Sequence, residues 1–157
     1  MIERIDHVNL VVDDLPAMTA FYRDVLGLRV TREATIRGDW IEAITGLADV
    51  EADVVYLEAG EGMPLELIAY RTPKGAHPPG LGKPNTRGIR HVAFLAGDLD
   101  AVVAALKAAD AELLSEIQQV PAGQVEFGGR RKRIVYCRDP EGNLLELCVY
   151  EQAATQP

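Results

Sequence analysis

The feature that most constrains the fold is an internal repeat, because two similar halves must each supply a similar set of strands and helices. The segment RIDHVNLVVDDLPAMTAFYRDVLGL resembles GIRHVAFLAGDLDAVVAALKAADAE, and both contain a histidine in an apolar stretch, an acidic turn and an amphipathic stretch. His7 aligns with His91 and Asp14 with Asp98, at an offset of 84 residues. Each half then reaches a Leu-Glu-Leu run, which centres on Glu66 or on Glu146. The sequence therefore predicts two copies of one structural unit.

Each copy is expected to begin with a strand, continue into a helix and return through further strands. Asp13 or Asp14 is placed to cap the first helix and Gly27 to end it, and Asp98 is placed to cap the second. Inside the first helix, Phe21 and Tyr22 follow the helical spacing of core residues. Four strands are predicted at 54–57, 65–70, 134–137 and 144–150. A tight turn is predicted at 139–143, and a short helix at 40–44. This order predicts an α+β fold.

The composition is that of a folded protein outside the membrane. Apolar residues make up 48% of the 157 residues, and no apolar run reaches the length of a membrane-spanning helix. The net charge of −8 argues against nucleic acid as a partner. The beginning MIERIDHV has no basic start or long apolar core, so we expect a cytoplasmic protein in which Cys137 and Cys148 are buried free thiols.

His7, Glu66, His91 and Glu146 are the candidate site residues, although each taken alone is more typical of an ordinary structural residue. Residues two apart in a strand share a face. A solvated face would carry Lys, Thr, Ser or Glu, whereas the residues that share a face with these four are mostly apolar. These neighbours are Ile5, Asn9, Val11, Pro64, Ile68, Tyr70, Ile89, Ala93, Leu95, Leu144, Cys148 and Tyr150. The repeat thus predicts two histidines and two glutamates on partly enclosed surfaces.

A divalent cation would explain this combination. A half-buried carboxylate is unfavourable unless it is paired or binds a cation, and two neighbouring carboxylates repel each other. Two neutral imidazoles and two carboxylates are a suitable ligand set for Zn, Ni, Co, Mn or Fe in the divalent state. We therefore expect His7, Glu66, His91 and Glu146 to be metal ligands.

The run Arg130-Arg131-Lys132-Arg133 is the one strongly basic segment. It is typical of a solvated hairpin arm. It also fits a clamp for an anionic group on a small ligand. The sequence leaves both interpretations open.

At these residues the sequence resembles the vicinal oxygen chelate superfamily, which includes glyoxalase I, methylmalonyl-CoA epimerase, extradiol dioxygenases and the bleomycin resistance proteins. The stretches that carry the resemblance are HVNLVVDDL, FYRDVLGL, LELI, GIRHVAFLAGDLDA and RDPEGNLLEL. The resemblance implies one domain over 1–157, built from two tandem βαβββ modules (about 1–71 and 88–151, with a linker at about 72–87) whose curved sheets form a cup around the metal. It also implies a homodimer and a small-molecule substrate or ligand.

The resemblance implies catalysis by proton transfer beside a metal-bound carbonyl, as in a glyoxalase-like lyase or an epimerase. Glu146 and Glu66 are then the candidate catalytic bases, with Glu146 favoured. Two alternatives remain, an oxygenase acting on a phenolic or natural-product substrate and a protein that binds an antibiotic or another natural product. The pocket walls are expected from the loops at 32–50, 72–87 and 121–129, which contain no motif that identifies the substrate.

Overall fold

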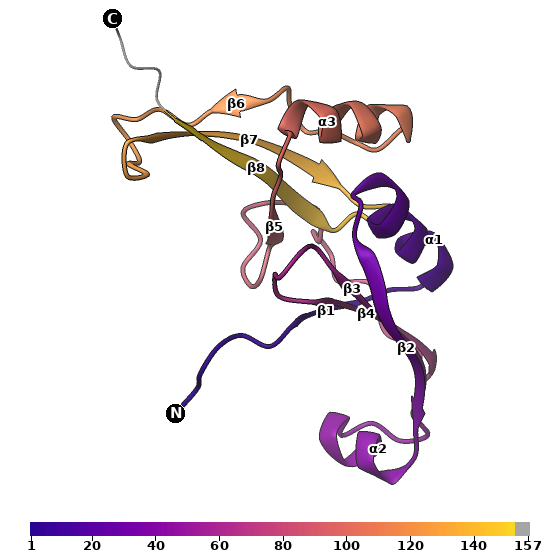
Figure 1. Ribbon diagram of the computed structural model, residues 1–157. Coiled ribbons are helices and arrows are strands. Elements are labelled where there is room, and N and C mark those ends of the chain that lie inside the picture. The colour runs from indigo at the N-terminus through magenta and orange to yellow at the C-terminus, as the bar shows by residue number, and fades with distance from the viewer. Residues whose placement is uncertain (153–157) are drawn as a thin grey trace, which may run out of the picture. The chain divides into compact units, whose positions relative to one another are not determined.

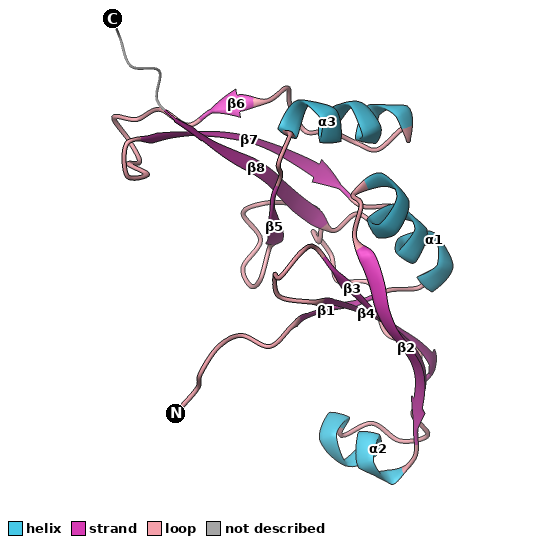
Figure 2. Ribbon diagram, viewed as in Figure 1, coloured by secondary structure: helices cyan, strands magenta, loops and turns pink. Residues whose placement is uncertain are grey.

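The computed structural model describes residues 1–152, and the chain divides into two compact units between Pro78 and Pro79. Each unit is one βαβββ module (Figures 1 and 2). Module 1 contains β1 (Val8–Val11), α1 (Leu15–Ala20), η1 (Phe21–Val25), β2 (Arg29–Arg37), α2 (Asp39–Thr45), β3 (Glu51–Glu58) and β4 (Leu65–Thr72). Module 2 contains β5 (His91–Leu95), α3 (Leu99–Ala108), β6 (Gln118–Gln119), β7 (Arg130–Arg138) and β8 (Leu144–Gln152).

The two sheets have the same topology. Their strand orders are β1-β4-β3-β2 and β5-β8-β7-β6. In each, the first strand pairs in parallel with the last one, and the remaining pairs are antiparallel. The glutamate of each Leu-Glu-Leu run therefore lies on an inner strand, between the first strand of its module and an antiparallel neighbour. The predicted tandem βαβββ architecture is confirmed.

Both main helices begin at the predicted aspartates. Oδ1 of Asp14 accepts a hydrogen bond from the amide of Ala17 at 3.0 Å, and Oδ1 of Asp98 accepts one from Ala101 at the same distance. These bonds satisfy amide groups that have no partner inside the helix. The first helix continues from α1 into η1, which is a π-helical turn, and Gly27 follows it with a φ of +75°.

The helical face and the facing sheet surface form the core of each module. Helix α1 packs on β3 and β4, and helix α3 packs on β8. Tyr22 is fully buried and Phe21 nearly so, which confirms their interpretation as core residues. The other fully buried side chains are Met18, Leu57 and Leu67 in module 1 and Leu99, Leu106, Val135, Cys137, Leu144, Leu145 and Leu147 in module 2.

A tight turn fixes the register of β7 and β8. Oδ1 of Asp139 accepts hydrogen bonds from the amides of Glu141 and Asn143 at 3.1 and 2.8 Å, and the amide of Gly142 donates to the carbonyl of Asp139 at 3.0 Å. Gly142 has a φ of +84°, which a residue with a side chain rarely adopts. The turn pairs Tyr136 directly with Glu146 in the sheet.

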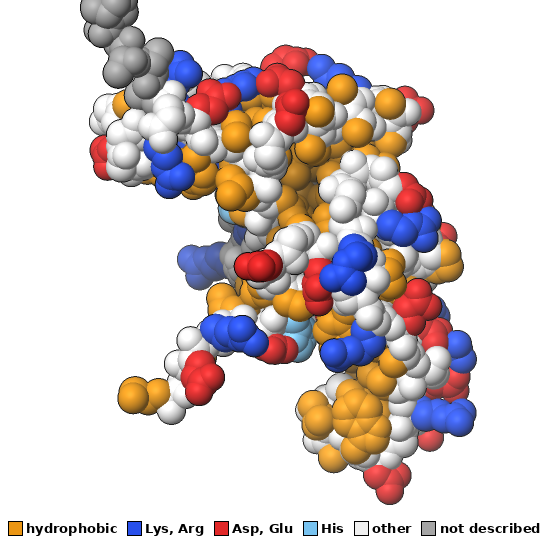
Figure 3. Space-filling model, viewed as in Figure 1, with side chains coloured by type: hydrophobic (Ala, Val, Ile, Leu, Met, Phe, Trp, Pro, Cys, Tyr) orange, Lys and Arg blue, Asp and Glu red, His pale blue; other side chains and the backbone are white. Residues whose placement is uncertain are grey.

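The segment 32–50 differs from the predicted loop. Its first part belongs to the nine-residue strand β2, and α2 follows where a short helix was expected. Trp40, Ile44 and Leu47 are exposed, and hydrophobic side chains are visible at the surface around α2 (Figure 3). Trp40 therefore does not line an enclosed pocket in module 1. No helix in residues 1–152 is long and apolar enough to cross a membrane.

Both cysteines are buried free thiols, as predicted. Burial raises the pKa of Cys137 to about 12 and also raises that of Cys148. Because the thiolate is the reactive form, we expect the native thiols to react with Ellman's reagent at pH 8 at least about 100-fold more slowly than in the denatured protein. The denatured control should release two equivalents per chain. Rapid reaction of both thiols in the native protein would contradict their placement.

Candidate metal centre

In module 1, the structure brings His7 and Glu66 together. His7 directly precedes β1 rather than lying within it, and its Nε2 is 3.4 Å from Oε2 of Glu66. The other ring nitrogen, Nδ1, is 2.9 Å from the carboxylate of Asp6. In metal sites, a carboxylate commonly accepts a hydrogen bond from the ring nitrogen that does not bind the metal, and this contact orients the imidazole.

Two neutral side chains hold Glu66 in place. Nδ2 of Asn9 donates a hydrogen bond to Oε2 at 2.7 Å, and the hydroxyl of Tyr56 donates a short hydrogen bond to Oε1. The register explains this arrangement, because Asn9 and Tyr56 are the residues paired with Glu66 from β1 and β3. The hydrogen bond to Glu66 and burial raise the pKa of Tyr56 to about 12, so its hydroxyl remains a donor at neutral pH.

In module 2, His91 and Glu146 form the corresponding pair. Nε2 of His91 is 3.6 Å from Oε2 of Glu146, and each imidazole of the two modules is 36% exposed. The Glu146 side chain is 9% exposed, compared with 14% for Glu66. The predicted enclosed surface is thus present around both glutamates, while the histidines are more open.

Glu146 has a charged partner that Glu66 lacks. Nζ of Lys132 lies 2.6 Å from Oε1 of Glu146, and the Lys132 side chain is 15% exposed. Burial opposes the charge of Lys132, but the hydrogen bond and negative charge of Glu146 outweigh burial and raise its pKa. Burial and the charge of Glu146 also raise the pKa of Tyr136, the neighbour of Glu146 in β7.

These contacts correct one step of the sequence argument. The burial of the two glutamates was taken to require a cation, but Lys132 already neutralises Glu146, and Asn9 and Tyr56 solvate Glu66. Burial alone therefore does not establish a metal site. The support for a metal site is instead the distance between the histidine Nε2 and the glutamate Oε2 in each module.

The distances within each pair fit neighbouring ligands of one ion. Two ligand atoms that each lie about 2.1 Å from a metal are about 3 to 3.6 Å apart when they are neighbours around it. The nitrogen-to-oxygen distances are 3.4 Å in module 1 and 3.6 Å in module 2. Within residues 1–152, neither module by itself contains three His, Cys, Asp or Glu side chains grouped to hold a metal. Each module thus supplies two candidate ligands.

Asn9, Tyr56 and Lys132 were not assigned a role from the sequence. The spacing contains a usable signal for Tyr56, because Tyr56 and Tyr136 precede Glu66 and Glu146 by the same interval. Asn9 lies on the face of His7, but Ala93 replaces it in module 2, so the repeat does not mark it. Lys132 is hidden within the basic run.

Two βαβββ modules of the same topology, each with a histidine beside a glutamate, define the class of protein to which the chain is similar. The family described as the Glyoxalase/Bleomycin resistance protein/Dioxygenase superfamily matches residues 4–147. The chain belongs to this superfamily.

Similar proteins align over nearly the whole chain. The uncharacterized protein YaeR of Escherichia coli is 30% identical over 96% of this chain and 98% of its own length. The ethylmalonyl-CoA/methylmalonyl-CoA epimerase of Cereibacter sphaeroides is 28% identical, with 94% and 98% covered. A glyoxalase family protein from Bacillus cereus has a solved structure that superposes with a TM-score of 0.81 at 27% identity, with 96% of both chains covered.

Proposed function

We propose that the protein is a divalent-metal-dependent lyase or isomerase whose ligands are His7, Glu66, His91 and Glu146. The observation that carries the proposal is the repeated pair, in which an imidazole Nε2 and a carboxylate Oε2 lie at the separation of neighbouring metal ligands. The donor set suits Zn, Ni, Co, Mn or Fe. Assembly as a homodimer is part of this proposal.

The contacts around the two pairs suit a metal centre whose ligands are held in position before the metal binds. Asp6 fixes the ring of His7 through Nδ1, and Tyr56 binds the Oε1 atom of Glu66. In module 2, Lys132 binds Oε1 of Glu146 and leaves Oε2 toward His91. In each glutamate, Oε1 is thus held by a side chain of the neighbouring strand and Oε2 lies beside the histidine, and in Glu66 Asn9 also donates to Oε2.

In the proposed reaction, Glu146 removes a proton from the carbon beside a substrate carbonyl and returns it. The bound metal would act as a Lewis acid toward the negative charge that develops on that carbonyl. Lys132 holds Oε1 of Glu146, so the proton would be accepted by Oε2, the proposed ligand atom, either while Oε2 is coordinated or after it leaves the metal transiently. Return to the same carbon is epimerisation, and return to the neighbouring carbon is a glyoxalase-type isomerisation. Glu66 is the second candidate base.

The relationship to an epimerase supports an isomerase. The ethylmalonyl-CoA/methylmalonyl-CoA epimerase aligns with 94% of the chain. The match to the superfamily, at residues 4–147, spans all four proposed ligand positions. A proton-transfer reaction needs a general base near the substrate carbon. Each module presents a largely buried carboxylate that could serve, Glu66 or Glu146.

The proposed function is tested by metal-dependent exchange of a substrate proton for deuterium. Purified protein is analysed for metal, then incubated in D2O with a methylmalonyl thioester or with a hemithioacetal of methylglyoxal, and the exchange is followed by NMR. We expect exchange that stops after chelation and returns with metal. Glu146→Gln should slow exchange by about 100-fold or more, because the general base is lost.

Other outcomes would overturn this function. Exchange that persists after complete removal of metal would contradict the proposed chemistry. Oxygen uptake that requires ferrous iron would indicate an oxygenase. A metal-free protein that binds aromatic compounds, without exchange under any metal, would indicate a binding or resistance protein.

A further inference from the structure

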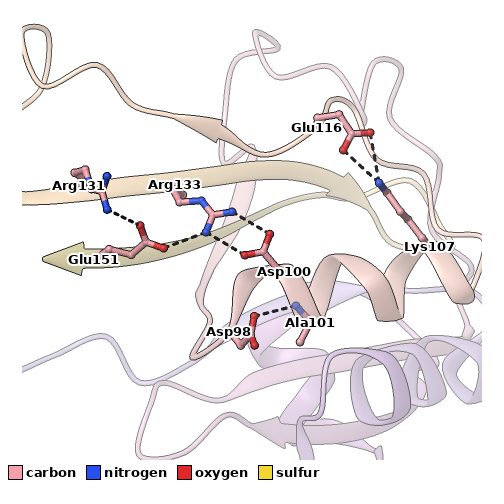
Figure 4. Close-up of polar contacts among 8 residues, drawn as sticks. All are labelled: Asp98, Asp100, Ala101, Lys107, Glu116, Arg131, Arg133 and Glu151. Atoms are coloured by element: carbon pink, nitrogen blue, oxygen red, sulfur yellow. Dashed lines mark hydrogen bonds and ion pairs between the residues drawn. The ribbon is translucent and has the colours of Figure 1, made fainter. Parts of the chain in front are cut away.

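The basic run Arg130–Arg133 divides between the two faces of the sheet in module 2. Figure 4 shows Arg131 and Arg133 directed toward Glu151 and Asp100, on the face that carries α3. The distances are 3.5 Å from Arg131 to Glu151, 3.0 Å from Arg133 to Glu151 and 2.9 Å from Arg133 to Asp100. Carboxylates of the module therefore already pair these two arginines.

Arg130 and Lys132 lie on the opposite face, which is the face of Glu146. They combine with two aromatic rings at this end of the sheet. The Arg130 guanidinium carbon is 4.7 Å from the centre of the Tyr150 ring, and Nζ of Lys132 is 5.6 Å from Tyr150 and 5.7 Å from Phe127. The rings of Phe127 and Tyr150 meet edge to face at 5.4 Å. Two cations and two aromatic rings thus form one cluster.

The charge of this cluster is incompletely balanced. Lys132 pairs with Glu146, but no ion pair joins Arg130 to a carboxylate within the described part of the chain. The guanidinium is a planar, weakly hydrated group that binds carboxylates and phosphates through two parallel hydrogen bonds. In a protein with a net charge of −8, an arginine that stacks on an aromatic ring and has no carboxylate partner among the described residues is free to bind the anionic group of a ligand.

We propose that Arg130, Lys132, Phe127 and Tyr150 form an anion subsite, which binds a carboxylate or phosphate on the substrate. This inference rests on the proposed function, which places the carbonyl at the other end of the substrate beside Glu146. Lys132 connects this cluster to Glu146, because its Nζ lies 2.6 Å from Oε1 of Glu146 and 5.6 Å from the centre of the Tyr150 ring. The substrate class is therefore a carbonyl compound that also carries an anionic group, which extends from the reacting carbon toward Tyr150 and Arg130.

The subsite is tested in the metal-free protein, so that a failure of the metal chemistry does not affect the result. Phenyl phosphate and benzoate are titrated by calorimetry, with benzyl alcohol as the uncharged control. We expect saturable binding of at least one anion and none of the alcohol. Comparing the two anions shows whether phosphate or carboxylate is preferred.

Two variants distinguish a specific site from general positive charge. Arg130→Gln should weaken anion binding by about tenfold or more, because it removes charge-assisted hydrogen bonds. The matched variant Arg131→Gln removes the same charge from the opposite face, and should change affinity by no more than about twofold. Absence of saturable anion binding, or equal losses in the two variants, would overturn the subsite while leaving the metal-dependent exchange reaction untouched.

Discussion

Replacing His91 by alanine is expected to lower the affinity for divalent metal by about 100-fold or more. Removing a hydrogen-bond partner of a metal ligand lowers the metal affinity by about 10- to 100-fold, and removing the ligand itself lowers it at least as much. The fold should persist, because the imidazole is 36% exposed and begins a strand rather than filling the core. Titration with Zn²⁺, Co²⁺ and Ni²⁺ and metal analysis of the purified variant measure the effect, and circular dichroism monitors the fold.

His77→Ala is the matched control, because His77 is the third histidine of the chain. Its side chain is 75% exposed, and its Nε2 lies 2.7 Å from a carboxylate oxygen of Asp13. We expect its metal affinity to equal that of the parent. A His91→Ala protein that holds metal as tightly as the parent would show that the assignment of His91 is wrong.

Leu147→Ala is expected to reduce the free energy of unfolding by about 2 to 5 kcal/mol. Leu147 is 1% exposed and lies in β8, where it pairs with Phe94 of β5 and Val135 of β7. Removing its side chain leaves a cavity between a sheet and its helix, which close packing cannot fill without distorting both. The effect is measured by urea denaturation.

Leu95→Ala provides the control for this loss. Leu95 ends β5 and is 70% exposed, so the same substitution should change stability by less than about 0.5 kcal/mol. Similar destabilisation of the two variants would contradict the placement of the module 2 core.

The repeat made the module architecture predictable, because its signals are local. The capping aspartates, the apolar stripe of the first helix and the hairpin turn at Asp139 all depend on residues close together in the chain. The edge strands were harder to recognise. Strand β2 pairs with β3 alone and contains mostly polar residues, and β6 has two residues, so neither has a clear apolar alternation.

The surroundings of the glutamates could not be predicted from the sequence, because they depend on strand register. Tyr56 faces Glu66 through the pairing of β3 with β4, and Asn9 reaches it through the parallel pairing of β1 with β4. Lys132 approaches Glu146 diagonally across β7 and β8. The sequence identified which residues share a face but not which ones oppose each other. This is why the neutralisation of Glu146 by Lys132 was missed.

The proposed metal centre requires both histidine and glutamate pairs to bind the same ion. Crystals grown with Co²⁺ or Zn²⁺, measured at the absorption edge of the metal, test this directly through anomalous scattering. We expect a strong peak within about 2.3 Å of Nε2 of His7 and His91 and of a carboxylate oxygen of Glu66 and Glu146. A metal peak that contacts one pair alone, or that lies away from all four residues, would contradict it.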